Sequence, residues 1–265
     1  MAAIAPEVSD LLQGKTGIIL GVANKRSIAY ACALTASKAG AELVLTYQGE
    51  RLKRGVETLA ATLPGKTTTV ECDVSEDDSL ERAFAEIGKR HEQIDFIVHS
   101  VAYADRQELE GRFSDTSRDG WRTALDVSAY SLAAVARHAD PLMREKGGSI
   151  VTMSYLGGER VLPHYNVMGP AKAALESTVR YLAADLGPHG VRVNAVSSGP
   201  VRTLAASGIT GFSSMLDMVA DRCPLRRTAT VEEVADSTLF LLSDLSRAVT
   251  GSTIWVDCGY HIMAV

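Results

Sequence analysis

The sequence predicts a doubly wound α/β fold, in which a parallel sheet of about seven strands carries helices on both faces. Short apolar or β-branched runs alternate with longer helical patterns along nearly all of the 265 residues. This alternation predicts parallel strands joined by right-handed helical crossovers. Runs such as FIVH and IVTM are apolar throughout, which is typical of strands that helices cover on both sides. No linker, repeat or low-complexity tract divides the chain, so we expect one domain over residues 1–265, with 1–13 as an N-terminal extension.

The predicted elements follow one another in a regular order. We predict strands at 16–21, 41–47, 67–74, 94–102, 149–155, 191–200 and 253–257. We predict helices between them at 27–39, 49–63, 75–91, 118–145, 166–186 and 231–242. Glycine or proline follows several of these helical patterns. The helix at 75–91 also has the acidic start and basic end that complement a helix dipole.

Composition and charge argue against several other classes of protein. The chain has 46% hydrophobic and 22% charged residues and a net charge of -5, which disfavours a nucleic-acid partner. Its four cysteines stand far apart, with no Cys/His cluster, so we expect neither a disulfide framework nor a metal site. The N-terminus does not look like a secretory signal, and no apolar stretch reaches the roughly 20 residues of a membrane span. We therefore expect a soluble protein of the cytoplasm, or of the plastid stroma if the source is a plant.

The first strand-to-helix turn has features of a dinucleotide-binding site. In a doubly wound sheet, ligands bind beyond the carboxyl ends of the strands, where the strand order reverses. Gly21 and Ala23 leave room for a pyrophosphate at a helix N-terminus, and Ser27 can cap that helix or bond a phosphate oxygen. The usual G-x-G-x-x-G pattern is absent, so the turn alone also fits a plain strand-to-helix connection.

Three further strand ends favour a cofactor at this edge of the sheet. Gln48 follows the second strand, where a dinucleotide-binding protein usually places an acid for the adenosine ribose. Asp73 and Val74 end the third strand, where they can contact the adenine ring. Ser100 and Val101 end the fourth strand with small side chains beside the crevice. Together with the glycine turn, these strand ends make a bound dinucleotide the better interpretation.

Two tyrosines and a lysine are the candidate catalytic residues. Tyr165 and Lys172 are seven residues apart, about 20° short of two helical turns, so a helix would place them on one face. A nearby ammonium ion favours the anionic form of a tyrosine, which suits a group that bonds a developing oxyanion. Tyr155 ends the fifth strand on the crevice side. Pro170 requires the helix to begin near 167–169, which makes the shared face approximate at Tyr165.

Several longer segments carry a family resemblance. They are GVANKRSIA, TYQGE, SYLGGERVLPHYNVMGPAKAALE, VRVNAVSSGPVRTLAASGI and VTGSTIWVDCGY. These segments resemble the enoyl-[acyl-carrier-protein] reductases of bacterial and plastid fatty-acid synthesis, which are divergent members of the short-chain dehydrogenase/reductase family. The resemblance runs from about Gly14 to Met263. Its combination of G-x5-S-x-A, Y-x6-K and a tyrosine ten residues upstream is specific, because ordinary family members have a glycine-rich turn and Y-x3-K.

The resemblance implies a Rossmann-type enzyme that passes a hydride from NADH to the β-carbon of a trans-2-enoyl thioester carried by acyl-carrier protein. It implies that Tyr165 bonds the enolate oxygen and that Lys172 holds the nicotinamide ribose. Tyr155 would line the acyl site, and Ala104 matches a position beside the substrate. The matching cofactor contacts are Gly21, Ser27, Ile28, Gln48, Asp73, Val74, Val101, Val201, Arg202, Thr203, Leu204 and Ala205. A homotetramer and a cover over the acyl chain, at about 203–218, are also implied.

Some positions depart from the family pattern. Tyr103 stands where phenylalanine is usual, and Ser198 stands where alanine is usual. Two alternatives follow from the same fold. A carbonyl (β-ketoacyl) reductase would have Y-x3-K and a serine in place of Tyr155. A dinucleotide-binding sensor without catalysis would keep the turn at Gly21 and lose the tyrosine–lysine pair.

Overall fold

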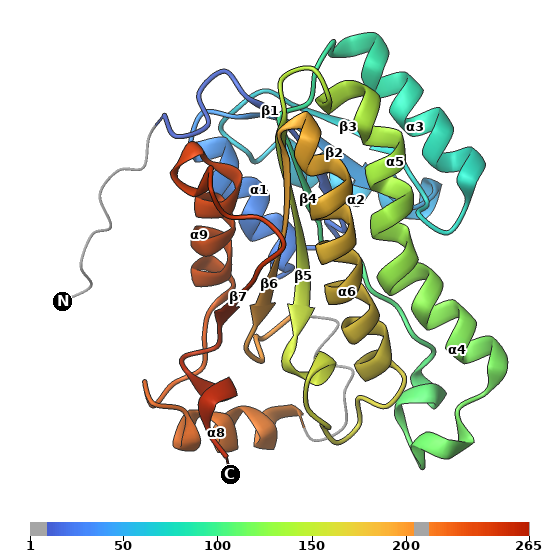
Figure 1. Ribbon diagram of the computed structural model, residues 1–265, viewed down its shortest axis with the longest axis vertical. Coiled ribbons are helices and arrows are strands. Elements are labelled where there is room, and N and C mark those ends of the chain that lie inside the picture. The colour runs from blue at the N-terminus through green and yellow to red at the C-terminus, as the bar shows by residue number, and fades with distance from the viewer. Residues whose placement is uncertain (1–9, 204–211, 265) are drawn as a thin grey trace.

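The computed structural model describes residues 10–203 and 212–264, which build one seven-stranded sheet with parallel neighbours throughout (Figure 1). The strands are β1 (Thr16–Leu20), β2 (Glu42–Tyr47), β3 (Thr67–Glu71), β4 (Phe96–His99), β5 (Gly148–Tyr155), β6 (Val191–Ser198) and β7 (Thr253–Val256). The helices are α1 (Ile28–Lys38), α2 (Glu50–Ala60), α3 (Asp77–Arg90), α4 (Arg118–Leu125), α5 (Ser131–Met143), α6 (Met168–Leu186), α8 (Phe212–Arg222) and α9 (Val231–Leu242). The strand order is β3-β2-β1-β4-β5-β6-β7. This order confirms the doubly wound fold, and its reversal between β1 and β4 puts the ligand crevice at their carboxyl ends.

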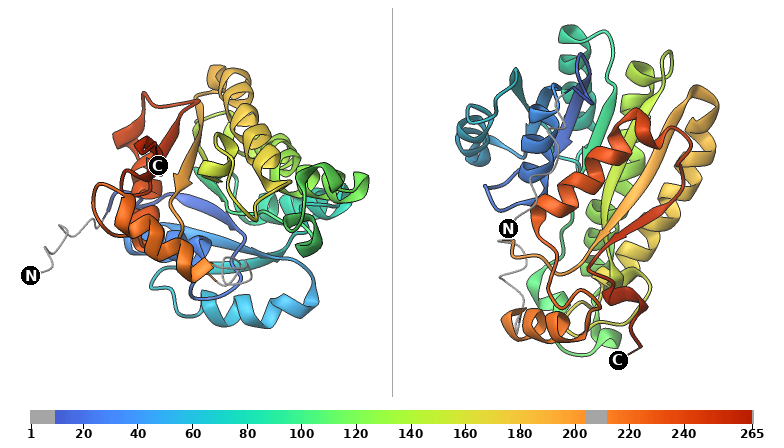
Figure 2. Two further views of the ribbon diagram at one scale, coloured as in Figure 1. Left: turned by 90° about the horizontal axis from the view of Figure 1, so that it is seen from below. Right: turned by 90° about the vertical axis from the view of Figure 1, so that its left-hand side faces the viewer.

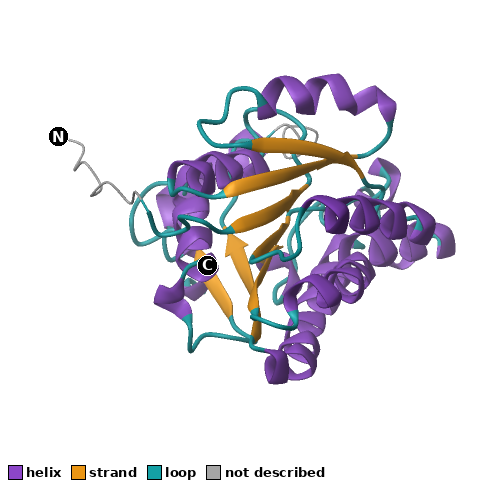
Figure 3. Ribbon diagram, turned by 90° about the horizontal axis from the view of Figure 1, so that it is seen from above, coloured by secondary structure: helices purple, strands orange, loops and turns teal. Residues whose placement is uncertain are grey.

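Helices cover both faces of the sheet (Figures 2 and 3). On one face, α1 and α9 pack over apolar strand side chains that include Ile19 and Val98. On the other face, α3, α5 and α6 pack over the intervening residues, which include Ile18 and Ile97. Fully burying one such aliphatic side chain stabilises the fold by about 1.5–3 kcal/mol. The continuous apolar runs in the sequence therefore reflect strands that are covered on both sides.

The long helix predicted over 118–145 is present from 118 to 143, but it is not a regular α-helix throughout. The segment forms α4, a π-helical turn at Asp126–Tyr130 and then α5. The Ser131 N–H bonds the Asp126 carbonyl oxygen, and the Ser131 hydroxyl donates to the Val127 carbonyl oxygen at 2.7 Å. One extra residue in a turn barely alters the apolar period, so the sequence pattern did not reveal the π-helical turn.

The helix expected at 166–186 begins two residues later, at Met168. Pro170 then lies in the first turn, where its missing N–H costs no hydrogen bond. Tyr165 consequently lies outside the helix, so the expected shared helical face of Tyr165 and Lys172 is corrected. The third and fourth strands also end earlier than expected, at Glu71 and His99.

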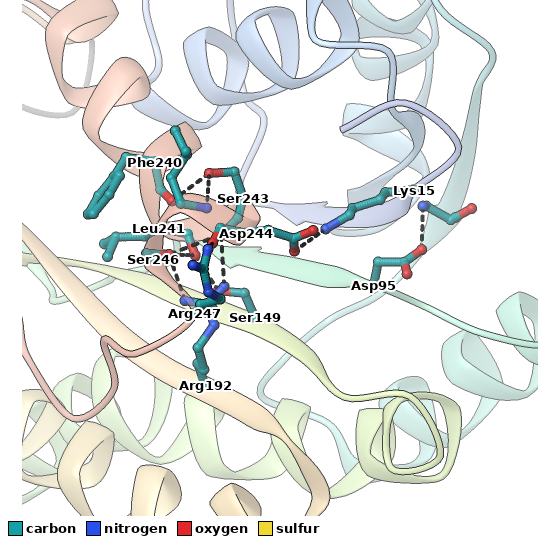
Figure 4. Close-up of polar contacts among 12 residues, drawn as sticks. Lys15, Asp95, Ser149, Arg192, Phe240, Leu241, Ser243, Asp244, Ser246 and Arg247 are labelled. Carbon is teal, nitrogen blue, oxygen red and sulfur yellow. Dashed lines mark hydrogen bonds and ion pairs between the residues drawn. The ribbon is translucent and has the colours of Figure 1, made fainter. Parts of the chain in front are cut away.

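Polar contacts tie the loops together at the amino-terminal edge of the sheet, which lies opposite the crevice (Figure 4). Lys15 forms an ion pair of 2.7 Å with Asp244, which follows α9. Arg192, the second residue of β6, donates to the Ser246 hydroxyl at 2.8 Å and to the Ser243 carbonyl oxygen at 3.3 Å. These bonds join β6 to the loop after α9. The charged groups at this edge therefore stabilise the fold.

Parts of two expected segments lie outside the described residues. These parts are 1–9 of the expected extension and 204–211 of the expected acyl cover. Leu12 is fully buried, and its N–H donates to the Ala39 carbonyl oxygen at 2.9 Å, so the chain joins the fold before residue 13. Helix α8 begins within the expected cover. No described helix is long and apolar enough to cross a membrane, and the described residues contain no group of three potential metal ligands.

Candidate active site

The turn between β1 and α1 approaches the end of β4 closely. Gly21 has a φ of 93°, a conformation that favours glycine. A Cβ at this position would lie only 2.0 Å from the Ser100 carbonyl oxygen. Ser27 caps α1 as predicted, because its hydroxyl accepts the Tyr30 N–H at 3.2 Å. Ala23 is exposed, and Ile28 is half-buried. The turn therefore presents backbone and small side chains to the crevice.

The ends of β2 and β3 are joined by a hydrogen bond. Gln48 Nε2 donates to Asp73 Oδ2 at 2.8 Å, and Ser75 donates to Asp73 Oδ1 through both its N–H and its hydroxyl. Burial opposes ionisation of Asp73, but the bonds from Ser75 and Gln48 lower the pKa of this carboxyl group. Val74 and Val101 are half-buried against the core. The structure thus brings the strand ends proposed from sequence to the same edge.

Tyr155 and Tyr165 meet edge to face at the end of β5. Their ring centroids are 5.1 Å apart, with an angle of 67° between the rings. A Cβ on Gly157 would lie 2.3 Å from Tyr165 Cδ1, so a glycine is needed for the ring to lie there. His164 and Asn166, which flank Tyr165, have φ values of 58° and 30°. Such non-glycine conformations cost of order 1–3 kcal/mol each.

The turn that carries Tyr165 is held by a contact with a loop that is distant in sequence. Asn166 Nδ2 donates to the carbonyl oxygens of Glu110 and Gly111, at 3.2 Å and 3.4 Å. Tyr165 is therefore positioned by a tertiary contact rather than by helical periodicity. The spacing in the sequence identified Tyr165 and Lys172 as a pair, but it did not give their arrangement in space.

Lys172 is buried and binds the backbone of β5. Its Nζ donates to the Met153 carbonyl oxygen at 2.8 Å, and burial lowers its pKa to about 8 although Glu176 opposes this change. Burial is also the main reason that the pKa of Tyr165 is raised, with smaller contributions from Tyr155 and Glu176. The expected stabilisation of a tyrosinate by Lys172 is therefore wrong for this arrangement. Tyr165 presents a neutral hydroxyl, which can donate a hydrogen bond.

Sequence reasoning missed a buried polar strip beneath α5 and α6. The side chains of His99, Thr152, Ser154 and Ser197 lie on this face of β4, β5 and β6, each at most 3% exposed. His99 bonds the hydroxyls of Thr152 and Ser131, both at 2.9 Å. Glu176 is also buried and accepts a hydrogen bond from the Ser154 hydroxyl. Its spacing of four residues from Lys172 is the signal that could have identified it.

The remaining candidate residues lie around the same edge. Ser198 is buried and pairs in register with Tyr155. Tyr103 is half exposed, and its hydroxyl donates to Asp105 at 2.7 Å, so the extra hydroxyl has a partner within its own loop. Ala104 is half-buried next to it. Beyond β6, Val201 is buried, Arg202 is exposed and Thr203 is half-buried. Leu204 and Ala205 lie outside the described residues.

The strand order and the glycine turn at its reversal point define a Rossmann-type α/β protein. Comparison with known proteins narrows this class. The chain belongs to the enoyl-(acyl carrier protein) reductase family, whose profile, described as "Enoyl-(Acyl carrier protein) reductase", matches residues 21–261.

Relatives match the chain over nearly its full length. An enoyl-[acyl-carrier-protein] reductase [NADH] of Bacillus cereus is 54% identical over 96% of this chain and 99% of its own. One from Rhizobium meliloti is 51% identical over 98% of this chain and 94% of its own. The solved structure of the Bacillus cereus enzyme with NADP+ and indole naphthyridinone has a TM-score of 0.95 and 53% identity, covering 97% of this chain and 100% of its own. The Anaplasma phagocytophilum enzyme in complex with NAD has a TM-score of 0.93 and 48% identity, covering 97% of each chain.

Proposed function

We propose that this protein is an NADH-dependent enoyl-[acyl-carrier-protein] reductase, which reduces the carbon–carbon double bond of trans-2-enoyl thioesters. This reaction is the last reductive step of the fatty-acid elongation cycle. One observation carries the proposal. Tyr155 and Tyr165 meet edge to face beside the β5 segment that holds buried Lys172, in a chain that matches NADH-dependent enoyl reductases over nearly its full length.

The groups around the crevice fit a dinucleotide. The backbone at Gly21 leaves no space for a Cβ, and the N-terminus of α1 offers N–H groups to an anion. Gly21, Ala23, Ser27 and Ile28 would bind the pyrophosphate, and Lys172 would bind the nicotinamide ribose. The further contacts would be Gln48, Asp73, Val74, Ser100, Val101, Val201, Arg202 and Thr203, with Leu204 and Ala205 from outside the described residues. When bound there, NADH would supply the hydride.

The protein groups around the thioester oxygen account for the chemistry. As the β-carbon receives a hydride, negative charge collects on this oxygen as an enolate. The neutral hydroxyl of Tyr165 would donate a hydrogen bond to it, and a preorganised donor in a water-poor site stabilises such charge strongly. The ammonium of Lys172 adds positive charge nearby. Tyr155 and Ala104 would line the acyl site and orient the double bond.

The wider assembly is also part of the proposal. The substrate would arrive as a thioester on acyl-carrier protein, and the enzyme would act as a homotetramer without a nucleic-acid or membrane partner. An open groove between α4, α5 and α6 is lined by three alanines and by the half-exposed Tyr130, among other residues, which suits contact with another copy. A cytoplasmic location is supported by the four free cysteines.

Two substrates test the proposed reaction against its rival on the same fold. The purified enzyme is given NADH and either crotonyl thioester or the matching β-ketoacyl thioester, and NADH consumption is followed by absorbance. We expect rapid oxidation with the enoyl substrate only. Turnover of the β-ketoacyl thioester alone would establish a carbonyl reductase, and binding of NADH without either turnover would establish a sensor.

A further inference from the structure

Helix α6 brings a lysine and a glutamate to the same buried strip of β5. Lys172 and Glu176 are four residues apart, so they share one face of the helix. Each is only 6% exposed. Adjacent residues of β5 hold them, because Lys172 Nζ donates to the Met153 carbonyl oxygen and the Ser154 hydroxyl donates to Glu176 Oε1. The carboxylate therefore has a fixed place beside the lysine.

The surroundings of Glu176 make this carboxylate unusual. Burying an unpaired carboxylate costs several kcal/mol, and an apolar side chain would fill the same space without that cost. The backbone also leaves space for it, because a Cβ on Gly158 would lie 3.2 Å from Glu176 Oε1 and 3.2 Å from the Lys172 carbonyl carbon. The fold thus accommodates a buried acid one helical turn away from the lysine.

The electrostatic effects on the two residues are reciprocal. Burial lowers the pKa of Lys172 to about 8, and Glu176 acts in the opposite direction. Burial raises the pKa of Glu176, whereas the Ser154 hydroxyl, Arg180 and Lys172 lower it and Glu159 raises it. Arg180 and Glu159 are exposed to solvent, so their charges are screened more than the charge of Lys172. Glu176 therefore favours the protonated form of Lys172 against the effect of burial.

We propose that Glu176 is a positioning residue of the active site, whose carboxylate holds Lys172 in its ammonium form. The inference rests on the proposed function, in which that ammonium binds the nicotinamide ribose. It explains how a fully covered lysine stays charged near neutral pH before the cofactor arrives. Without the carboxylate, Lys172 would lose its proton at a pH where the enzyme works, and its bond to the ribose would weaken.

Titration of Lys172 tests the inference directly. The rate at which acetic anhydride labels Lys172 in the cofactor-free enzyme is measured against pH by mass spectrometry, for wild type and Glu176→Gln. Loss of a neighbouring opposite charge shifts a pKa by about 1–3 units. We therefore expect the midpoint of labelling to fall by about one pH unit or more in Glu176→Gln. The NADH affinity of Glu176→Gln should also decline as the pH rises through this lowered midpoint of Lys172.

Two further variants separate charge from packing. Glu159→Gln removes a neighbouring exposed acid that acts on Glu176, and it should leave the Lys172 midpoint at its wild-type position. Glu176→Asp retains the carboxylate and should preserve most of the ammonium's stability, which keeps the test available if Glu176→Gln does not fold. A Lys172 midpoint that is unchanged in Glu176→Gln, or lowered fully in Glu176→Asp, overturns the inference. Absence of enoyl reduction in wild type would overturn the proposed function while leaving this titration readable.

Discussion

Tyr165 reaches the crevice from a strained turn, and its ring is held between Gly157 and Tyr155. Burial raises the pKa of its hydroxyl, so the group is a donor rather than a base at neutral pH. A donor that is already oriented costs little reorganisation when charge develops on the substrate. The strained backbone at His164 and Asn166 therefore serves to orient the Tyr165 hydroxyl.

Replacement of Tyr165 by phenylalanine should separate catalysis from cofactor binding. Loss of one preorganised donor typically lowers turnover by about 100- to 1000-fold. We expect Tyr165→Phe to lower kcat for enoyl reduction to this extent while the dissociation constant of NADH stays near the wild-type value. Tyr155→Phe is the matched control, because it keeps the edge-to-face contact and removes only a hydroxyl. A larger loss in Tyr155→Phe than in Tyr165→Phe would reverse the roles assigned to the two residues.

Gln48 should decide the choice between NADH and NADPH. Its amide donates to Asp73, so the side chain that we propose at the adenosine ribose is neutral and next to an acid. A 2′-phosphate requires a paired cation, and nearby Lys53 already forms an ion pair with Glu50 at 3.4 Å. We expect a higher kcat/KM with NADH than with NADPH, and a smaller difference in Gln48→Arg. A preference for NADPH in the wild type would instead implicate Arg51 or Lys53 in phosphate binding.

Elements with local end signals were predictable from the sequence. Helix α9 has the predicted bounds, because Thr230 and Glu233 form a capping box at its start. The strands were identified from their apolar runs, since both faces of the sheet are covered. The carboxyl ends of the third and fourth strands were placed too late, because the residues beyond them still read as apolar or small.

Elements that depend on distant contacts could not be predicted in this way. The π-helical turn is stabilised by Ser131, which also bonds His99 on β4. The turn that carries Tyr165 is held by the backbone at Glu110 and Gly111, 55 or more positions away. Buried Glu176 appears in the sequence as an ordinary charged helix residue. The hydrogen-bond partner of Glu176 is Ser154 on β5, 22 positions away, and only the spacing from Lys172 marks Glu176 in the sequence. In each case a bonded partner is distant in sequence, so local periodicity does not report the contact.

Two helix caps provide a test of the cofactor turn. Ser27 caps α1 and Thr230 caps α9, each by accepting a backbone N–H. Replacement of such a cap by alanine typically costs about 1 kcal/mol of stability. We expect Ser27→Ala and Thr230→Ala to lower the free energy of unfolding by similar amounts, but only Ser27→Ala to raise the dissociation constant of NADH. Equal NADH affinity in the two variants would remove Ser27 from the pyrophosphate site.

The two ends of the parallel strands have different roles. The amino-terminal ends carry bonds that stabilise the fold, and the carboxyl ends carry the candidate active-site residues. At the amino-terminal edge, Arg192 and Lys15 are bonded to loop groups around Ser246 and Asp244. At the carboxyl edge, the strip of polar strand side chains faces α5 and α6 and ends beside Lys172. A buried polar group without a hydrogen-bond partner costs stability. Both ring nitrogens of His99 bond the buried hydroxyls of Thr152 and Ser131, so protonation of His99 affects the stability of the fold.

His99 should make the whole molecule sensitive to acid. Burial, aided by Lys172, lowers the pKa of His99 from 6.5 to about 3. Between these values the unfolded chain binds a proton that the native state does not, so stability is complete above pH 6.5 and is lost as the pH falls toward 3. The loss is about 1.4 kcal/mol for each pH unit, or about 2 kcal/mol between pH 7 and pH 5.

Urea unfolding at pH 7 and pH 5 measures this contribution. His99→Asn keeps a polar side chain in the strip but does not titrate, so its stability should fall by about 2 kcal/mol less than that of wild type over this interval. The control is His189→Asn, because His189 is exposed and forms an ion pair with Asp140 at 3.2 Å. Loss of that residue should not reduce the acid sensitivity. If wild type and His99→Asn lost equal stability between the two pH values, His99 would carry a proton in the folded protein, and the buried strip would have to accommodate a second cation beside Lys172.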